Sequence, residues 1–228
     1  MTELLQYTFF RYALLAVVLA AVAGALMGAY VVARRMVLLT GGITHACFGG
    51  LGLGVFAGWN PVFTAALFAA ASALGVEWLS ARRGVRPDTA IGVMWAFGMA
   101  AGTMLIFLTP DYNGDLSAFL FGNILLVSPS DLLALGVFLL VSGAFIGLFY
   151  RQIVASAFDP DFAHTIGLPA RRFNGAMTLL VSVCVVLCIR VTGIMLLLSL
   201  FTLPPTIAER FTCRLAPIMA VSAAVSVV

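Results

Sequence analysis

The stretch from Met36 to Gly58, MVLLTGGITHACFGGLGLGVFAG, is apolar enough to cross a membrane, yet it contains His45 among many glycines. A helix that begins near Met36 places His45 roughly 13 Å along its axis, near the middle of a ~30 Å hydrocarbon layer. An ionisable side chain is costly at this depth, so we expect His45 to face a protein interior or a water-filled cavity. Two interpretations stay open: a structural histidine bonded to a neighbouring backbone, or a substrate ligand on a translocation path.

The composition of the whole chain is that of a polytopic helical membrane protein. Of the 228 residues, 63% are hydrophobic and only 9% are charged, which does not fit a soluble globular domain. The four cysteines lack the paired spacing of a zinc or disulfide site, and we interpret them as small buried apolar residues. The sequence has no phosphate-binding glycine loop, HExxH or GxSxG motif. We therefore expect a non-enzymatic chain with no cofactor of its own, powered by an ion gradient or a partner if it pumps.

Hydropathy predicts about eight membrane-spanning segments in one domain covering residues 1–228. Arginines cluster on alternate connections, which places the N-terminus outside and these clusters in the cytoplasm, with Arg190 as the exception. Gly24 and Gly28 form a GxxxG pair that predicts a helix-packing face. The approximate segment bounds are Phe9–Ala33, Met36–Gly58, Val62–Ala81, Thr89–Leu108, Asp131–Tyr150, Phe173–Ile189, Val191–Leu203 and a last segment from Leu215.

Two further features lie between or near the ends of these segments. Glu77 is close to the end of the third segment, and we expect it to snorkel or to pair with the neighbouring arginines. The connection Thr109–Ser130 carries Asp111 and Asp115 and no basic residue. It also contains LSAFLFGNILLVS, which is apolar but too short to span and is predicted to be a half-helix.

The predicted cytoplasmic connection Arg151–Arg172, RQIVASAFDPDFAHTIGLPARR, contains the signals of a short helix. Asp159 can cap its start, Pro160 suits the first helical position, and Gly167 can stop it. Phe162, Ala163 and Ile166 would then form one apolar face. The helix is either a membrane-surface element or a projection that docks in a groove on a soluble protein.

Three motifs together resemble one family of membrane permeases. FDPDFAHTIGLPARRF, followed by a span and VTGIMLLLSLFTLPPTIAERF, resembles the permease of ATP-binding-cassette (ABC) importers for zinc, manganese or iron. LSAFLFGNILLVSPSDL resembles the SYLFG-type segment of that family, and VARRMVLLTGGITHACFGGLGLG resembles its RR-x-x-L…SHA…G region. The resemblance covers nearly the whole chain, in order.

The resemblance implies a type II, cobalamin-importer-like permease fold in the bacterial inner membrane. It implies alternating access driven by a separate ATPase subunit, beside a second permease copy or a related permease and an extracytoplasmic metal-binding protein. Membrane lipid is the remaining expected partner, and no nucleic acid is expected. The expected substrate is a divalent metal, zinc first and then manganese or iron. Members commonly have more spans, so we expect C-terminal helices beyond Val228.

The resemblance also implies two sets of site residues. The metal set that carries over is His45 with its neighbour Thr44, and the set that couples to the ATPase is Phe158, Asp159, Ala163 and Gly167. Asp88, at the predicted cytoplasmic start of the fourth segment, is a further candidate metal ligand from its position alone. The family usually has an aspartate where this chain has Gly41, and many members have a second histidine where it has Ala96. A lone imidazole cannot form the three- or four-ligand site that zinc prefers. Either the second subunit or Asp88 adds a ligand, or transit uses a weak site.

Two other classes of function remain as alternatives. A secondary transporter or channel without an ATPase would need intramembrane acids for ion coupling, and Glu77 is the candidate that the sequence offers. A non-transporting scaffold or receptor would not need a centrally buried histidine among glycines. The departures at Gly41 and Ala96 also leave room for a non-metal or unusual-metal substrate.

Overall fold

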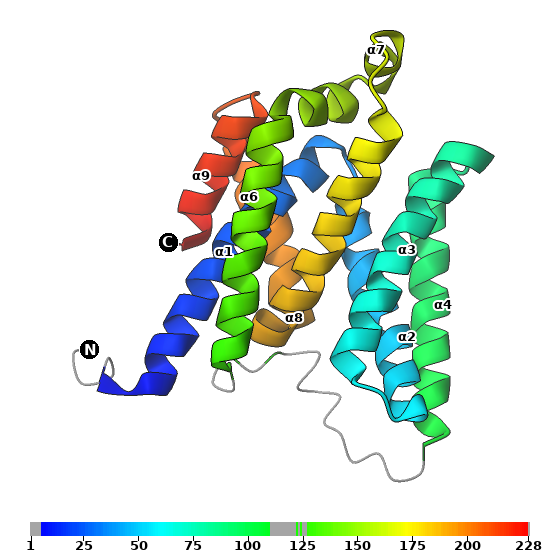
Figure 1. Ribbon diagram of the computed structural model, residues 1–228, viewed down its shortest axis with the longest axis vertical. Helices are drawn as coiled ribbons and strands as arrows, with labels where there is room; N and C mark the ends of the chain where they lie inside the picture. The colour runs from blue at the N-terminus through cyan, green and yellow to red at the C-terminus, as the bar shows by residue number, and fades with distance from the viewer. Residues whose placement is uncertain (1–5, 110–121, 123, 125–126, 228) are drawn as a thin grey trace. The chain divides into compact units, whose positions relative to one another are not determined.

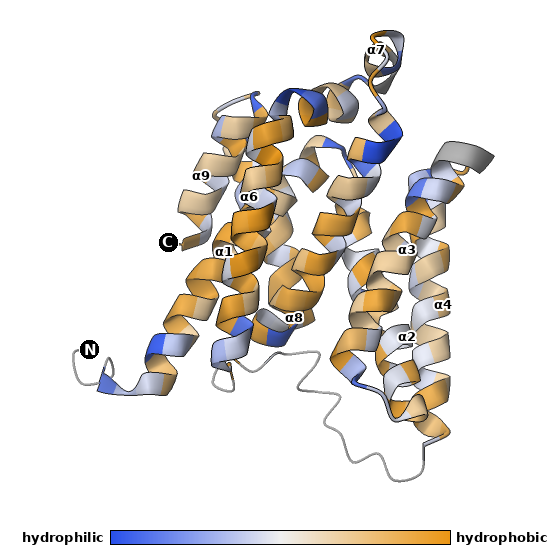
Figure 2. Ribbon diagram, in the orientation of Figure 1, coloured by the Kyte–Doolittle hydropathy of each residue, from blue (hydrophilic) through white to orange (hydrophobic). Residues whose placement is uncertain are grey.

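The computed structural model describes residues 6–109, 122, 124 and 127–227, and all regular structure in these ranges is helical (Figure 1). Six of the described helices are long and apolar enough to cross a membrane, and hydrophilic residues gather near helix ends and connections (Figure 2). The predicted all-α membrane fold is confirmed. The helices are α1 (Thr8–Ala33), α2 (Val37–Ala57), α3 (Pro61–Arg83), α4 (Pro87–Phe107), α6 (Pro129–Phe158), α7 (Pro160–Thr165), α8 (Ala170–Ala208) and α9 (Leu215–Val227).

Helix α8 covers two of the predicted segments. Its 39 residues are interrupted at Gly193, where φ is 74° and ψ is 171°. This backbone conformation is open essentially only to glycine, so the break falls at Gly193 and not at the predicted position beside Arg190. The helix also continues past its predicted end at Leu203, with Pro204 and Pro205 inside it. Just after these prolines the Thr206 hydroxyl donates a hydrogen bond to Thr202 O at 2.6 Å.

Local sequence signals set the end of α2 and the start of α3, whereas α6 is longer than predicted. Gly58 ends α2 with φ of 68°. Asn60 Oδ1 then accepts a hydrogen bond from Val62 N at 3.0 Å, and Pro61 occupies the first turn of α3. Helix α6 continues beyond its predicted end to Phe158, with non-helical backbone at Phe149. The predicted acidic connection with Asp111 and Asp115, and most of the predicted half-helix, lie outside the described residues.

The chain divides into two compact units, each described here by itself. The first comprises Met1–Ala33, Asp115–Val154 and Leu187–Val228, and the second comprises Arg34–Gly114 and Ala155–Val186. The organisation as one permease domain stays a prediction.

In the first unit, α1 packs against α9, and its glycines Gly24 and Gly28 meet the second part of α8. A Cβ atom added at Gly24 would lie 3.0 Å from Leu200 Cγ, and one at Gly28 would meet the backbone of Phe201. The predicted packing face at this glycine pair is thus confirmed. Arg190, the exception to the arginine pattern, is paired with Asp131 at 2.6 Å, so its charge is neutralised locally.

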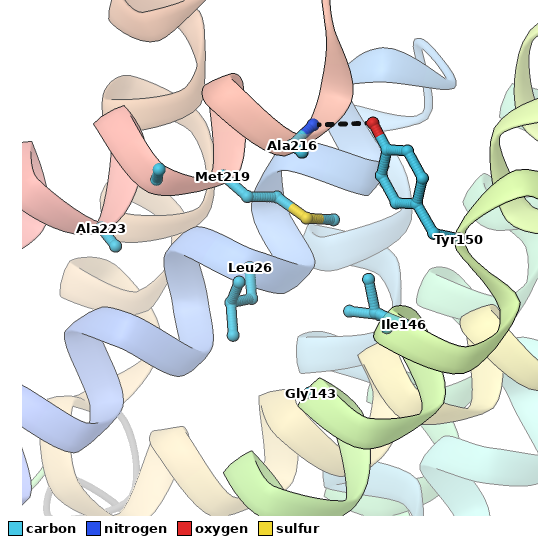
Figure 3. A pocket seen from close by; sticks show the side chains of 9 residues that line it. Leu26, Gly143, Ile146, Tyr150, Ala216, Met219 and Ala223 are labelled. Atoms are coloured by element: carbon cyan, nitrogen blue, oxygen red, sulfur yellow. Dashed lines mark hydrogen bonds between the residues drawn. The ribbon is translucent and has the colours of Figure 1, made fainter.

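The first unit also contains an apolar cavity of about 580 Å³ between α1, α6 and α9 (Figure 3). Leu26, Ile146 and Met219 line it, and Tyr150 Oη accepts a hydrogen bond from the Ala216 backbone N at 3.1 Å at its edge. The lining contains no carboxylate, imidazole or thiol, so this cavity has no group suited to binding a metal ion.

The second unit is built around α2, which packs against both α3 and α4. Glycines bring the α2 and α4 backbones together. A Cβ atom at Gly98 would lie 2.6 Å from Ala46 Cα, and one at Gly52 would lie 2.7 Å from Gly102 Cα. Glycine is required here for the close approach of the two backbones.

We expect Gly102→Ala to destabilise the protein, because its new Cβ would lie 2.9 Å from Gly49 N and clash with the Phe48 backbone. Overpacking of this kind costs about 1–3 kcal/mol, which corresponds to a drop of roughly 3–10 °C in the melting temperature of the detergent-solubilised protein. Gly92→Ala on the same helix is the matched control, since its Cβ would meet nothing within 4 Å. Equal melting temperatures for the two variants would contradict this packing.

Candidate functional site

His45 lies on α2 with its imidazole stacked on the indole of Trp95 from α4. The ring centroids are 4.4 Å apart and the ring planes differ by 8°. Gly98 is three residues after Trp95 and brings the α4 backbone against Ala46, the residue next to His45. The close backbone approach therefore allows the two rings to meet face to face.

His45 is polar, partly buried and incompletely satisfied. Its Nδ1 atom is buried and has no hydrogen-bond partner among the described residues, so the expected bond from a structural histidine to a neighbouring backbone is not seen at this atom. Trp95 Nε1 donates a hydrogen bond to Met99 Sδ at 3.3 Å, one turn further along α4. The ring is thus held by stacking, and a nitrogen lone pair of a neutral imidazole can bind a cation.

The other predicted metal residues are not gathered around His45. Thr44 is fully buried and donates its hydroxyl to the Thr40 carbonyl one turn earlier. Asp88 is exposed in the first turn of α4, about 10 Å along the helix axis from Trp95. Gly41, one turn before His45, is buried and offers no side chain. In the described part of the chain no three His, Cys, Asp or Glu residues lie close enough to hold a metal ion.

Trp95 is the site residue that the sequence did not reveal. The resemblance aligned the second family histidine with Ala96, but Ala96 is exposed and the residue facing His45 is Trp95. A tryptophan beside the aligned position is the one available signal, and only the packing of α4 on α2 shows which of the two residues turns toward the histidine.

Glu77 on α3 is held by two partners within the second unit. Its Oε1 atom lies 2.6 Å from Arg34 Nη1 and accepts a hydrogen bond from Thr178 Oγ1 at 2.9 Å. The expected pairing with an arginine is confirmed, but the partner comes from the connection before α2. This is a tertiary contact that the chain order does not show. A carboxylate committed in this way is a poor carrier for the coupling ion of a secondary transporter.

We expect Glu77→Ala to lower the free energy of unfolding, because it removes the carboxylate that faces Arg34. Both side chains are mostly buried, with exposed fractions of 16% and 18%, so the loss should be on the order of 2 kcal/mol, between the values for exposed and fully buried pairs. Thermal unfolding in detergent measures this change. Glu209→Ala, at an exposed carboxylate, is the control and should leave the melting temperature unchanged.

The short helix α7 forms as its sequence signals predict. Asp159 accepts a hydrogen bond from Phe162 N at 2.8 Å, Pro160 starts the helix, and Gly167 follows it with φ of 75°. The apolar residues divide into two faces: Ala163 is fully buried, whereas Phe162 and Ile166 are exposed. Phe158, just before the helix, is also exposed. We call Phe158, Phe162 and Ile166 the α7 apolar patch.

The chain is a helical membrane protein with an imidazole inside one of its candidate spans. The sequence profile of the ABC 3 transport family matches residues 6–228, so this chain belongs to that family. ATP hydrolysis in the family is carried out by a separate ATPase subunit, and the chain is a permease subunit.

Individual proteins support the same placement. The protein described as "Probable metal transport system membrane protein" from Chlamydia pneumoniae is 35% identical over 209 residues, covering 89% of this chain and 71% of that protein. "Manganese transport system membrane protein MntC" from Listeria monocytogenes is 30% identical over 212 residues, covering 93% of this chain and 75% of that protein. PsaBC from Streptococcus pneumoniae, solved in complex with a Fab, matches with a TM-score of 0.84 at 23% identity, over 99% of this chain and 83% of that chain.

The comparisons confirm the ABC permease resemblance and the type II permease fold. They also place the chain among multi-pass membrane proteins with bacterial relatives. The roles of the individual site residues stay predictions.

Proposed function

We propose that this chain is the membrane permease of an ATP-driven importer of divalent metal ions, with manganese as the first substrate. The observation that carries the proposal is His45, which sits inside a predicted span with an unpartnered Nδ1 atom, in a chain of the ABC 3 transport family. The names of its relatives mention metal and manganese transport. We therefore propose manganese as the first substrate, where the sequence alone led us to expect zinc.

The chemistry of the site also favours manganese over zinc. Zinc prefers closed tetrahedral sites of nitrogen and sulfur ligands, whereas manganese accepts oxygen-rich shells that include water and carbonyl groups. The site offers the imidazole of His45, and no group of three His, Cys, Asp or Glu residues forms there among the described residues. Such a site binds weakly, and weak binding allows release on a transport path.

Energy reaches this path through α7 in the proposed mechanism. The α7 apolar patch is presented on a helix fixed by the Asp159 cap and by the buried Ala163. Exposed aromatic side chains on a rigid helix are suited to a groove on another protein. We propose that the ATPase subunit binds this patch, and that its ATP-driven movement of α7 switches the permease between outward and inward access.

The remaining parts of the assembly are proposed from the family resemblance. A second copy of this chain or a related permease completes the pore and supplies a second imidazole or a carboxylate. An extracytoplasmic protein delivers the metal, and the complex lies in the bacterial inner membrane. Asp88, exposed at the start of α4, is placed near the cytoplasmic exit and would meet the ion after His45.

The proposal is tested by measuring cellular metal content with mass spectrometry in cells that express this chain with its ATPase and binding protein. Manganese should accumulate above the level in cells whose ATPase carries an inactivated nucleotide site, with smaller changes for zinc and iron. Unchanged content of all three metals, with the assembled complex present in the membrane, would contradict the proposal.

A further inference from the structure

The apolar cavity between α1, α6 and α9 is an open groove on the first unit (Figure 3). Gly143 and Gly147 on α6 line it, and a Cβ atom added at either glycine would meet nothing within 4 Å. On α9 the lining runs from Ala216 to Ala223, which is two helical turns or roughly 10 Å. Because α1 and α6 are long and apolar enough to span a membrane, we expect hydrocarbon chains and not water to fill this groove.

One end of the groove is polar. There Tyr150 Oη accepts a hydrogen bond from Ala216 N at 3.1 Å, which holds the start of α9 beside α6. Arg151 follows Tyr150, and Arg214 comes two residues before Ala216. Both arginines are exposed, and neither guanidinium group has an ion-pair or hydrogen-bond partner among the described residues. This end of the groove therefore has two uncommitted positive charges and a hydroxyl whose proton remains available to donate.

We propose that this groove binds one anionic phospholipid, with an acyl chain along the two α6 glycines and the phosphate at Arg151 and Arg214. A guanidinium group donates paired hydrogen bonds to phosphate oxygens, and basic residues between the cytoplasmic ends of membrane helices suit anionic headgroups. The arginine pattern places both residues on the cytoplasmic side, where the membrane surface is negative. The nearby exposed residues Glu209 and Arg210 have opposite charges, so the net charge of this end stays positive.

The headgroup part of the proposal is tested by native mass spectrometry of the purified complex of this chain with its ATPase. Phosphatidylglycerol and phosphatidylcholine are titrated separately, and the wild type should bind phosphatidylglycerol at least ~10-fold more tightly. Arg151→Gln and Arg214→Gln should each lower this preference about 5-fold, the effect of one basic side chain near an anionic membrane surface. Arg86→Gln, at an exposed arginine before α4, is the control and should keep the wild-type preference.

The acyl-chain part is tested by Gly143→Leu. Its side chain would enter open space and occupy the groove, so phosphatidylglycerol binding should weaken at least ~5-fold, because the displaced chain loses its packing contacts. Gly136→Leu on the same helix also meets nothing within 4 Å at its Cβ, but Gly136 does not line the groove. This control should bind phosphatidylglycerol as the wild type does.

Three results would overturn the proposal. The first is equal wild-type affinity for the two lipids, and the second is an unchanged preference in both Arg151→Gln and Arg214→Gln. The third is loss of a protein subunit in Gly143→Leu while the wild type retains no lipid, which would assign the groove to a helix of a partner protein. Lipid binding is measured without transport, so a failure of the proposed metal import would leave this test intact.

Discussion

His45→Ala should reduce ATP-driven manganese uptake by at least ~10-fold, because it removes the side chain whose nitrogen we place on the ion path. The loss should appear as initial rates of radiolabelled manganese uptake into proteoliposomes that contain the permease, its ATPase and its binding protein. Basal ATP hydrolysis and assembly should change little, since His45 lies on α2 and not on α7, the helix that we propose binds the ATPase. The expected variant is thus an assembled complex that fails to move its substrate.

Two comparisons separate a ligand role from a packing role at this position. Trp95 stacks on the His45 ring, so a purely structural histidine would be replaced well by Phe, which keeps a stacking ring. A histidine that binds the transported ion cannot be replaced by Phe, so His45→Phe should be as inactive as His45→Ala. Thr44→Val removes a hydroxyl that is already donated to the Thr40 carbonyl, and it should retain most uptake. Full uptake in His45→Phe would make His45 structural and place the path elsewhere.

Phe162→Asp should separate the permease from its ATPase, because it puts a charge in the centre of the α7 apolar patch. Phe162 is 54% exposed, and aromatic hot spots in protein interfaces are worth about 2 kcal/mol or more, so recovery of the ATPase on affinity-tagged permease should fall at least ~10-fold. ATP-driven uptake should fall with it. Co-purification followed by quantitative gel analysis measures the association directly.

A substitution on the opposite side of the same helix is the matched control. His164 is exposed and lies roughly 200° around α7 from Phe162, so His164→Ala should leave the association intact. Gly167→Pro should act like Phe162→Asp, because proline cannot adopt the φ of 75° found there and it removes the hydrogen bond from Gly167 N to His164 O. Normal ATPase recovery and normal uptake in both Phe162→Asp and Gly167→Pro would contradict docking through α7.

Local signals made α7, the end of α2 and the start of α3 predictable from sequence. The cap at Asp159, the proline after it and the left-handed glycine at Gly167 act within a few residues, so their outcome did not depend on the rest of the fold. The GxxxG face of α1 was predictable for a similar reason, since small residues spaced by one turn have few uses other than packing.

Contacts between distant parts of the chain were the ones that sequence reasoning missed or left open. The choice between Trp95 and Ala96 depends on the rotation of α4 against α2, and a one-residue difference turns a side chain by about 100°. The partner of Glu77 was expected among nearby arginines, but the structure pairs it with Arg34, 43 residues away in the sequence. The segment bounds predicted a break at Arg190, whereas the backbone breaks at Gly193, one glycine among many in the chain.

Pulsed electron paramagnetic resonance of bound manganese tests the central claim most directly, because it detects nitrogen nuclei coordinated to the ion. The nucleotide-free complex, without its binding protein and at saturating manganese, should show imidazole nitrogen modulation. The modulation should disappear in His45→Ala and persist in His164→Ala, which removes the other histidine of this chain. Modulation that is unchanged in His45→Ala, or absent from the wild-type complex, would contradict the passage of manganese past His45.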